Sequence, residues 1–192
     1  MNFLNLNKPI NKLKPQVGRL LIAEPFLNDP NFARSVILIC EHGEEGTVGF
    51  ALNRTTELTL GDLLPELYTP LKVFQGGPVQ MDTLHMIHRI PQILDGNELN
   101  KGVYWGGSYE ALQEAIINKI CKPADIRLFI GYSGWSPGQL ERELLENSWI
   151  VADMASELLF ETEPEDVWKR AISLLGSDFA YLANMPTNPQ LN

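Results

Sequence analysis

The 192-residue chain has few cysteines and no long apolar run. Its two cysteines, Cys40 and Cys121, cannot form a disulfide framework, and their spacing matches no metal site. The leading MNFLNLNKPINKLKP lacks the apolar core of a signal peptide, and no later run is long enough to span a membrane. We therefore expect a cytoplasmic protein with no membrane partner, in which both thiols are reduced and packed.

Positive charge is also scarce. The chain has 15 lysines and arginines against 24 acidic residues, which gives a formal net charge of −9. Such a field repels phosphate backbones, so nucleic acid is an unlikely partner. The leader is the exception, because Lys8, Lys12 and Lys14 occur there without an acidic residue. Direct DNA binding through this basic leader therefore stays open as an alternative.

The sequence lacks the residues that common cofactors and metals require. It contains neither a Walker A pattern nor a dinucleotide fingerprint. Its three histidines are His42, His85 and His88, and the last two would point to opposite faces of a strand. We therefore predict no cofactor and no metal site.

Apolar runs of strand length alternate with amphipathic segments. We expect strands at 17–23, 36–42, 47–53, 72–75, 83–90, 102–105, 125–133, 148–152 and 158–160. The turn GEEG joins the second and third of these into a β-hairpin. We expect helices at 60–64 and 109–120, from Pro137 onward, and within 162–176. This mixture predicts an α+β fold with a mixed β-sheet surrounded by helices.

The chain length favours one domain, at residues 18–183. A flexible basic leader at 1–17 would precede it and an extended tail at 184–192 would follow it. Capping residues mark the helix starts within the domain. Thr59, followed three residues later by Asp62, opens a short helix, Thr162 with Glu165 has capping-box spacing, and Ser108 is a candidate N-cap.

The stretch GYSGWSPGQLERE, residues 131–143, combines glycines, aromatics and serines before a helical run. Ser136, Pro137 and Gln139 fit the N-cap, N1 and N3 positions of a helix. Ser133 resembles the nucleophile of a strand–turn–helix elbow, but Trp135 stands where that motif requires glycine. Packing and capping are the alternative interpretation of these residues.

Glycine-rich helix starts that follow strands expose backbone N–H groups, which attract anions. If the strands at 102–105 and 125–133 lie side by side, both helix starts line one edge of the sheet. We therefore expect a protein partner or a small anionic ligand near these starts. The candidate ligand-binding residues are Gly76, Gly77, Tyr132, Trp135, Gln139, Glu41, His42, Asn53 and Arg54.

Several segments, taken in order, resemble the motifs of the bacterial YqgE/AlgH family. They include GRLLIAEPFLNDPNFARSVILICEHGEEGTVGFALNR, FQGGPVQMDTLHMIHR, GVYWGGS, FIGYSGWSPGQLERELLENSWIV and DVWKRAISLLG. The resemblance covers roughly residues 18–176. It implies a cytosolic bacterial protein whose bifurcated, partly barrel-like sheet is surrounded by helices. Members of this family are labelled transcriptional regulators, so the resemblance implies that role. It implies no catalytic residues for this chain.

Three functions follow from these observations. A non-enzymatic binding or regulatory protein is favoured, because glycine-rich helix starts lie beside aromatics and no catalytic constellation is visible. The first alternative is a hydrolase that uses His42 or Ser133. The second is a regulator that binds DNA directly through the leader, although the chain is acidic and has no helix-turn-helix with a basic recognition helix.

Overall fold

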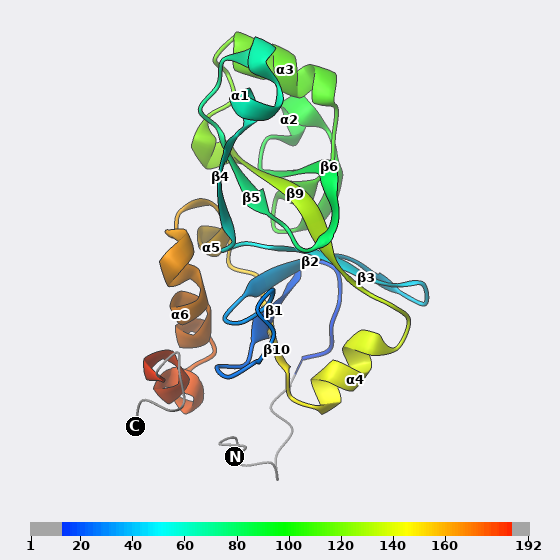
Figure 1. The fold of residues 1–192 in the computed structure, drawn as a ribbon, viewed down its shortest axis with the longest axis vertical. Coiled ribbons are helices and arrows are strands. Elements are labelled where there is room, and N and C mark those ends of the chain that lie inside the picture. Colours follow the sequence, from blue (N-terminus) through cyan, green and yellow to red (C-terminus); the bar gives the residue numbers. More distant parts are fainter. Residues whose placement is uncertain (1–12, 186–192) are drawn as a thin grey trace.

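The computed structural model describes residues 13–185, which form a ten-stranded sheet with helices around it (Figure 1). The strands are β1 Arg19–Ala23, β2 Val36–Gly43, β3 Gly46–Ala51, β4 Thr55–Thr59, β5 Lys72–Gln75, β6 Val79–His88, β7 Asn97–Asn100, β8 Val103–Trp105, β9 Ile126–Trp135 and β10 Trp149–Asp153. The α-helices are α1 Leu60–Leu63, α2 Pro91–Leu94, α3 Tyr109–Ile117, α4 Gln139–Leu145, α5 Ser156–Phe160 and α6 Pro164–Leu174. The 3-10 helices are η1 Pro65–Leu67, η2 Pro123–Asp125 and η3 Ser177–Asn184.

The α+β class and the mixed sheet are confirmed. The main strand order is β10-β1-β2-β3-β9-β6-β8-β7, with β5 beside β9 and β4 beside β5. Among the strands of residues 13–185, only β5 and β9 run parallel, and the other pairs are antiparallel. Because β10 and β7 end this order without pairing to each other, the sheet is not closed into a barrel.

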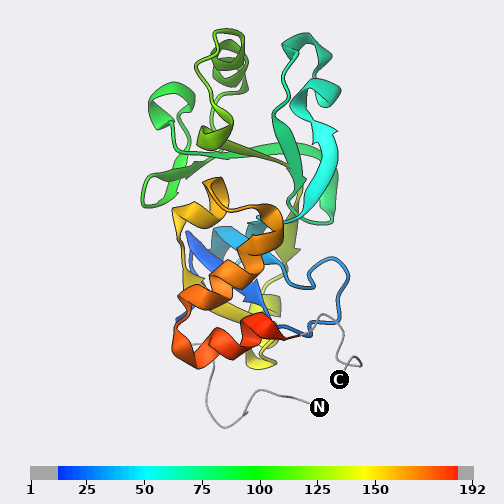
Figure 2. The ribbon, with the colours of Figure 1, turned by 90° about the vertical axis from the view of Figure 1, so that its left-hand side faces the viewer.

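The lower lobe in Figure 1 contains β10, β1, β2, β3 and the end of β9. Side chains alternate across its strands, so Leu20 and Leu21 of β1 belong to different core clusters. The cluster of Leu20 includes Trp168 of α6, whereas the cluster of Leu21 includes Leu140 of α4. Helices α6 and α4 therefore cover opposite faces of this half of the sheet (Figure 2).

The upper lobe contains β4 to β8 and the start of β9, with α1, α2 and α3 at its far end (Figure 1). Its core cluster joins Leu60 of α1 and Leu112 of α3 to Leu128 of β9. The predicted helix start at Thr59 is confirmed, and Thr59 and Asp62 form a capping box there by exchanging hydrogen bonds between side chain and backbone.

Strand β9 belongs to both lobes. Its last residues pair with β3, where Ser133 lies opposite Gly49, and its first part pairs with β5 and β6. The chain bends between these parts at Gly131, whose φ of +62° lies in the left-handed region that favours glycine. A single bent strand therefore makes the sheet bifurcate.

The Gly76–Gly77 pair makes this bifurcation sterically feasible. A Cβ on Gly76 would lie 2.4 Å from the carbonyl oxygen of Gly131. A Cβ on Gly77 would lie 2.3 Å from the backbone carbonyl carbon of Tyr132. Neither position has room for a side chain, because β9 backbone occupies that space.

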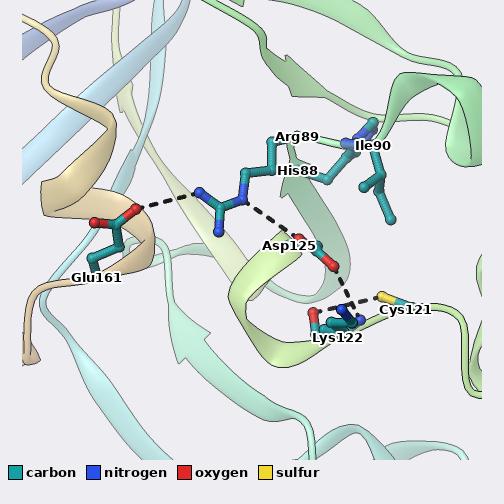
Figure 3. A network of polar contacts seen from close by, with 7 residues as sticks. All are labelled: His88, Arg89, Ile90, Cys121, Lys122, Asp125 and Glu161. Carbon is teal, nitrogen blue, oxygen red and sulfur yellow. Dashed lines mark hydrogen bonds and ion pairs between the residues drawn. The ribbon is translucent and has the colours of Figure 1, made fainter.

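A polar network joins the lobes where α5 meets the upper lobe (Figure 3). The Arg89 guanidinium lies 3.5 Å from Asp125 and 3.4 Å from Glu161, and it also covers the Phe160 ring at 5.0 Å. Arg127 adds a hydrogen bond from its Nε to the Leu159 carbonyl oxygen. Side chains of the upper lobe thus hold the end of α5 in place.

Several predicted elements are wrong or begin elsewhere. Residues 158–160 lie in the helix α5 and not in a strand, because an apolar run this short fits both structures. Helix α6 is capped at Glu163 without a side-chain hydrogen bond, since the Thr162 hydroxyl donates to the Glu157 carbonyl oxygen instead. Helix α4 begins at Gln139 after Gly138, whose φ is +74°. The N-cap Ser108 of α3 is confirmed.

The ends of the predicted domain lie at the edges of the described range. Residues 1–12 of the basic leader and 186–192 of the tail lie outside it. Leu13 and Val17 pack against the core clusters of the lower lobe. The tail begins in η3 at Asn184, before the extended Met185.

Candidate functional site

Residues 131–135 form the end of β9 rather than a loop before a helix. Ser133 is fully buried and donates a hydrogen bond to the Gly76 carbonyl oxygen at 2.8 Å. Its hydroxyl therefore holds the bifurcation together and is out of reach of a substrate. Gly76 accepts a second hydrogen bond from the Ala51 N–H, so its carbonyl joins three parts of the sheet.

Trp135 anchors α4 to the sheet. Its indole Nε1 donates to Glu143 Oε2 at 2.8 Å, and Trp149 Nε1 donates to the same oxygen at 2.7 Å. Gln139 donates to Glu143 Oε1 at 2.9 Å and accepts from the Ser136 N–H at 3.0 Å. Trp135 is only 5% exposed. Its side chain and that of Gln139 are therefore engaged in holding the helix.

An open groove lies between the β2–β3 hairpin, the end of β9 and the start of β6, with a volume of about 400 Å³. It is lined by Glu41, Glu45, Gly46, Thr47, Val48, Val79, Tyr132, Gly134, Trp135, Ser136 and Pro137. We call this the hairpin groove. The turn of the β2–β3 hairpin packs closely against the end of β9, since a Cβ on Gly46 would lie 2.3 Å from the Trp135 carbonyl oxygen.

The floor of the hairpin groove follows strand register. Glu41 lies opposite Val48, Val48 lies opposite Gly134, and Tyr132 lies opposite Val79. The Tyr132 ring lies along the strand, because its Cε2 is 3.3 Å from the place that a Cβ of Gly134 would take. Glycine at 134 thus leaves space for the ring, and Tyr132 and Val79 remain half-buried at the surface of the groove.

The charge of the hairpin groove is negative. Glu41 and Glu45 are exposed at its rim, and no lysine or arginine belongs to the described lining. The irregularity between Ile39 and Glu41 in the β2–β3 pairing accompanies the change from buried Cys40 to exposed Glu41. A cation or a hydrogen-bond donor is the chemical group that such a rim attracts.

The predicted site residues separate into groups. Glu41, Tyr132 and Trp135 line the hairpin groove. His42 lies beside it, with Nδ1 2.8 Å from the Thr47 hydroxyl oxygen. That hydroxyl belongs to a residue only 4% exposed.

Asn53 and Arg54 lie beyond the other end of β3. Asn53 accepts from the Val36 N–H and donates to the Arg34 carbonyl oxygen. Arg54 donates to the Ser35 hydroxyl and to the Ala33 carbonyl oxygen. These two side chains hold the loop before β2, and the structure does not bring them to the hairpin groove.

The two glycine-rich helix starts do not meet. Strand β6 separates β8 from β9, and Trp105 at the end of β8 is level with Arg127 near the start of β9. The start of α4 follows the other end of β9, in the lower lobe. The expectation that both starts line one edge is therefore wrong.

Burial shifts the pKa of both cysteines and of two histidines outside the hairpin groove. Burial raises the pKa of the Cys40 thiol well above its ordinary value, and burial with the nearby Asp125 raises the pKa of Cys121 to about 11. Burial lowers the pKa of His85 and His88. Both thiols are free in the described structure, and residues 13–185 contain no cluster of three or more potential metal-ligating side chains.

The family now follows from comparison with known proteins. A family model described as AlgH-like matches residues 20–180. The chain belongs to the AlgH-like family. This confirms the resemblance to the YqgE/AlgH family that the sequence motifs indicate.

Relatives and solved structures of the AlgH-like family agree over nearly the whole chain. The UPF0301 protein CT0663 of Chlorobaculum tepidum is 44% identical and covers 94% of this chain and 96% of its own. A UPF0301 protein of Cytophaga hutchinsonii is 41% identical, covering 91% and 98%. The solution structure of AlgH from Pseudomonas aeruginosa has a TM-score of 0.70 at 29% identity, covering 92% and 98%. Protein DIP2367 of Corynebacterium diphtheriae has a TM-score of 0.75 at 26% identity, covering 90% and 94%.

These names state no activity. None of its described helices has the length and apolarity to cross a membrane. Sequence reasoning missed Glu45, Val48 and Val79, which complete the hairpin groove. The position of Glu45 in the hairpin turn could have indicated that it lies near Glu41. The pairing of Val79 with Tyr132 depends on the fold and is not visible in the sequence.

Proposed function

We propose that this AlgH-like protein is a non-enzymatic binding protein whose hairpin groove receives an exposed segment of a partner protein bearing a lysine or arginine. The observation that carries the proposal is the composition of the groove. Two glutamates at the rim stand over a floor that exposes parts of Val48, Tyr132 and Val79. Protein interfaces commonly combine an aromatic anchor with a polar rim in this way.

The geometry supports a lysine or arginine as the side chain by which the partner binds the groove. Its aliphatic stem would lie on the Tyr132 ring, and its charged end would reach Glu41 or Glu45. The described lining offers no cation to bind an anion, so a small anionic ligand fits this groove less well. A regulatory role would then act through protein contacts, as the acidic net charge also favours.

The hydrolase alternative gains one contact but lacks an accessible nucleophile. His42 lies 2.8 Å from the Thr47 hydroxyl, as a general base would from its partner. However, Thr47 is 4% exposed and Ser133 is 0% exposed. The DNA-binding alternative depends on leader residues outside the described range, and it stays a prediction.

Affinity purification from the native cell extract with two matched variants tests the proposal. The Glu41→Lys, Glu45→Lys double variant reverses the rim charge on exposed side chains, so the fold should persist. The control Glu141→Lys, Glu146→Lys makes the same charge change on exposed positions of α4 and its C-cap.

We expect a protein retained by wild type and by the α4 control but lost from the rim variant. Its retention should also weaken as salt rises, because exposed charges are screened within about 10 Å at 0.1 M ionic strength. Equal retention by the rim variant and the control would contradict a role for the hairpin groove.

A further inference from the structure

We infer that a second groove, between the starts of β5 and β9, binds a small organic carboxylate with an apolar body. It has a volume of about 280 Å³ and lies in the upper lobe, away from the hairpin groove. Its only charged lining residues in the described structure are Lys72 and Arg127. The inference is independent of the proposed function, since the two grooves share no residue.

Lys72 and Arg127 are neighbours across a parallel strand pair. Val73 lies opposite Leu128, so Lys72 and Arg127 stand one position earlier on the same face of the sheet. Adjacent strands are about 4.8 Å apart, and like charges directly opposite each other destabilise a sheet. An anion between them would remove this repulsion, which makes the pair a preformed binding site for a negative charge.

The Arg127 guanidinium is held in place but retains free donors. Its Nε donates to the Leu159 carbonyl oxygen, and its guanidinium carbon lies 4.5 Å from the centre of the Phe74 ring. Among residues 13–185, no hydrogen bond or ion pair engages its two terminal nitrogens. A fixed guanidinium with unused donors suits a carboxylate, which it can bind through two parallel hydrogen bonds.

The opposite charge of Glu163 does not neutralise the pair. Glu163 acts on Arg127 through its field, but the two form no ion pair within hydrogen-bonding reach. Neither does Lys72 form an ion pair in the described part of the chain. Burial lowers the pKa of Arg127, which is the cost of keeping an unpaired charge partly out of water.

The walls define the rest of the ligand. Two exposed prolines, Pro70 and Pro123, border the groove, and Leu71 and Ile126 lie beneath it. A volume near 300 Å³ with apolar walls and a few polar groups is typical of sites for small molecules. An inorganic anion would leave these walls without a contact, so the groove favours a carboxylate joined to an aliphatic or aromatic body.

An NMR titration of the ¹⁵N-labelled full chain with hexanoate tests this inference. Hexanoate should shift the backbone amides of Lys72 and Arg127 and the Arg127 Nε–H signal. The uncharged hexanamide and inorganic phosphate serve as comparison ligands. Each should bind at least about tenfold more weakly, because the first lacks charge-assisted hydrogen bonds and the second lacks the apolar body.

Two variants complete the test. Lys72→Glu reverses an exposed charge at the groove and should weaken hexanoate binding at least about tenfold. Lys101→Glu makes the same change at an exposed position between β7 and β8 and should leave binding unchanged. The inference is overturned if hexanoate leaves the groove signals unmoved. It is equally overturned if hexanamide or phosphate binds as well as hexanoate, or if both variants behave alike.

Discussion

Trp135 and Trp149 donate their indole hydrogen bonds to one carboxylate oxygen, Glu143 Oε2, at 2.8 and 2.7 Å. Their rings meet edge to face with centroids 5.7 Å apart. Trp135 precedes helix α4 in the sequence and Trp149 follows it, so their bonds to Glu143 within the helix fix that helix to the sheet. The GYSGW segment of β9, residues 131–135, is therefore explained mainly by architecture, and its half-buried Tyr132 belongs to the lining of the hairpin groove.

Removal of the Glu143 carboxylate should destabilise the protein. Glu143→Ala removes the acceptor of both indoles and of the Gln139 amide, and we expect a loss of about 2–4 kcal/mol in the free energy of unfolding. Urea unfolding followed by tryptophan fluorescence measures this loss. The control Glu141→Ala, on the exposed face of the same helix, should change stability by about 0.5 kcal/mol or less. Equal effects of the two substitutions would contradict the anchoring role.

A side chain at Gly77 should disturb the bifurcation of the sheet. The Cβ of Gly77→Ala would lie 2.3 Å from backbone atoms of Tyr132, which cannot rotate away. We expect a loss of about 1–3 kcal/mol, as for other overpacked sites, measured as a lower midpoint of thermal unfolding. Gly43→Ala is the matched control, because its Cβ would meet nothing within 4 Å. An unchanged midpoint for Gly77→Ala would show that β9 does not pass as close as described.

Local elements were predictable from the sequence, whereas the bifurcation was not. The β2–β3 hairpin and the Thr59 and Ser108 caps depend on residues a few positions apart, so spacing alone reveals them. The two halves of β9 pair with different strands, and that choice depends on contacts distant in the sequence. The sequence shows a strand and a glycine at 131, but not that the strand bends there.

The candidate site was predictable to a similar extent. The sequence singled out Glu41 and Tyr132, which do line the hairpin groove, because an aromatic in a glycine-rich stretch and the strands of a β-hairpin are visible locally. It also grouped Asn53 and Arg54 with them, although these lie past the opposite end of β3. Lys72 and Arg127 gave no local signal, since only the parallel pairing of β5 with β9 makes them neighbours.

Stability should fall in mild acid through His88. This ring is fully buried, accepts from the Ile90 N–H at Nδ1 and donates from Nε2 to the Gly106 carbonyl oxygen at 3.0 Å. Burial lowers its pKa below the ordinary value of about 6.5, so it is neutral in both states at higher pH. Below about pH 6.5 the His88 ring is protonated in the unfolded chain but stays neutral in the folded chain. The free energy of unfolding therefore decreases as the pH falls.

Urea unfolding at a series of pH values measures this dependence. We expect a contribution from His88 of at most about 1.4 kcal/mol per pH unit below that range. His88→Gln should flatten the curve, because glutamine does not titrate. A variant with the same pH dependence as the wild type would show that His88 does not contribute, and NMR titration of the ring gives its pKa directly.

The contact between lobes at Arg89 should contribute only modestly to stability. Its two ion pairs are partly exposed, and it also covers the Phe160 ring. We expect Arg89→Ala to cost about 1–2 kcal/mol, from weak exposed pairs and one cation–π contact. Arg89→Lys should keep part of this energy. Thermal unfolding at low and high salt separates the two contributions, since only the ion pairs are screened. A loss that disappears fully at high salt would contradict the ring contact.

We propose that the hairpin groove contacts a basic segment of a partner protein. Photocrosslinking in cells from p-benzoylphenylalanine at Tyr132 tests it most directly, with the same group at the 93% exposed Tyr68 of the upper lobe as control. We predict an adduct from position 132 that is absent at 68, disappears with Glu41→Lys and Glu45→Lys, and joins the probe next to a lysine or arginine of the partner. The same adduct from both positions, or one that survives the charge reversal, would show that the hairpin groove does not bind a basic segment of the partner.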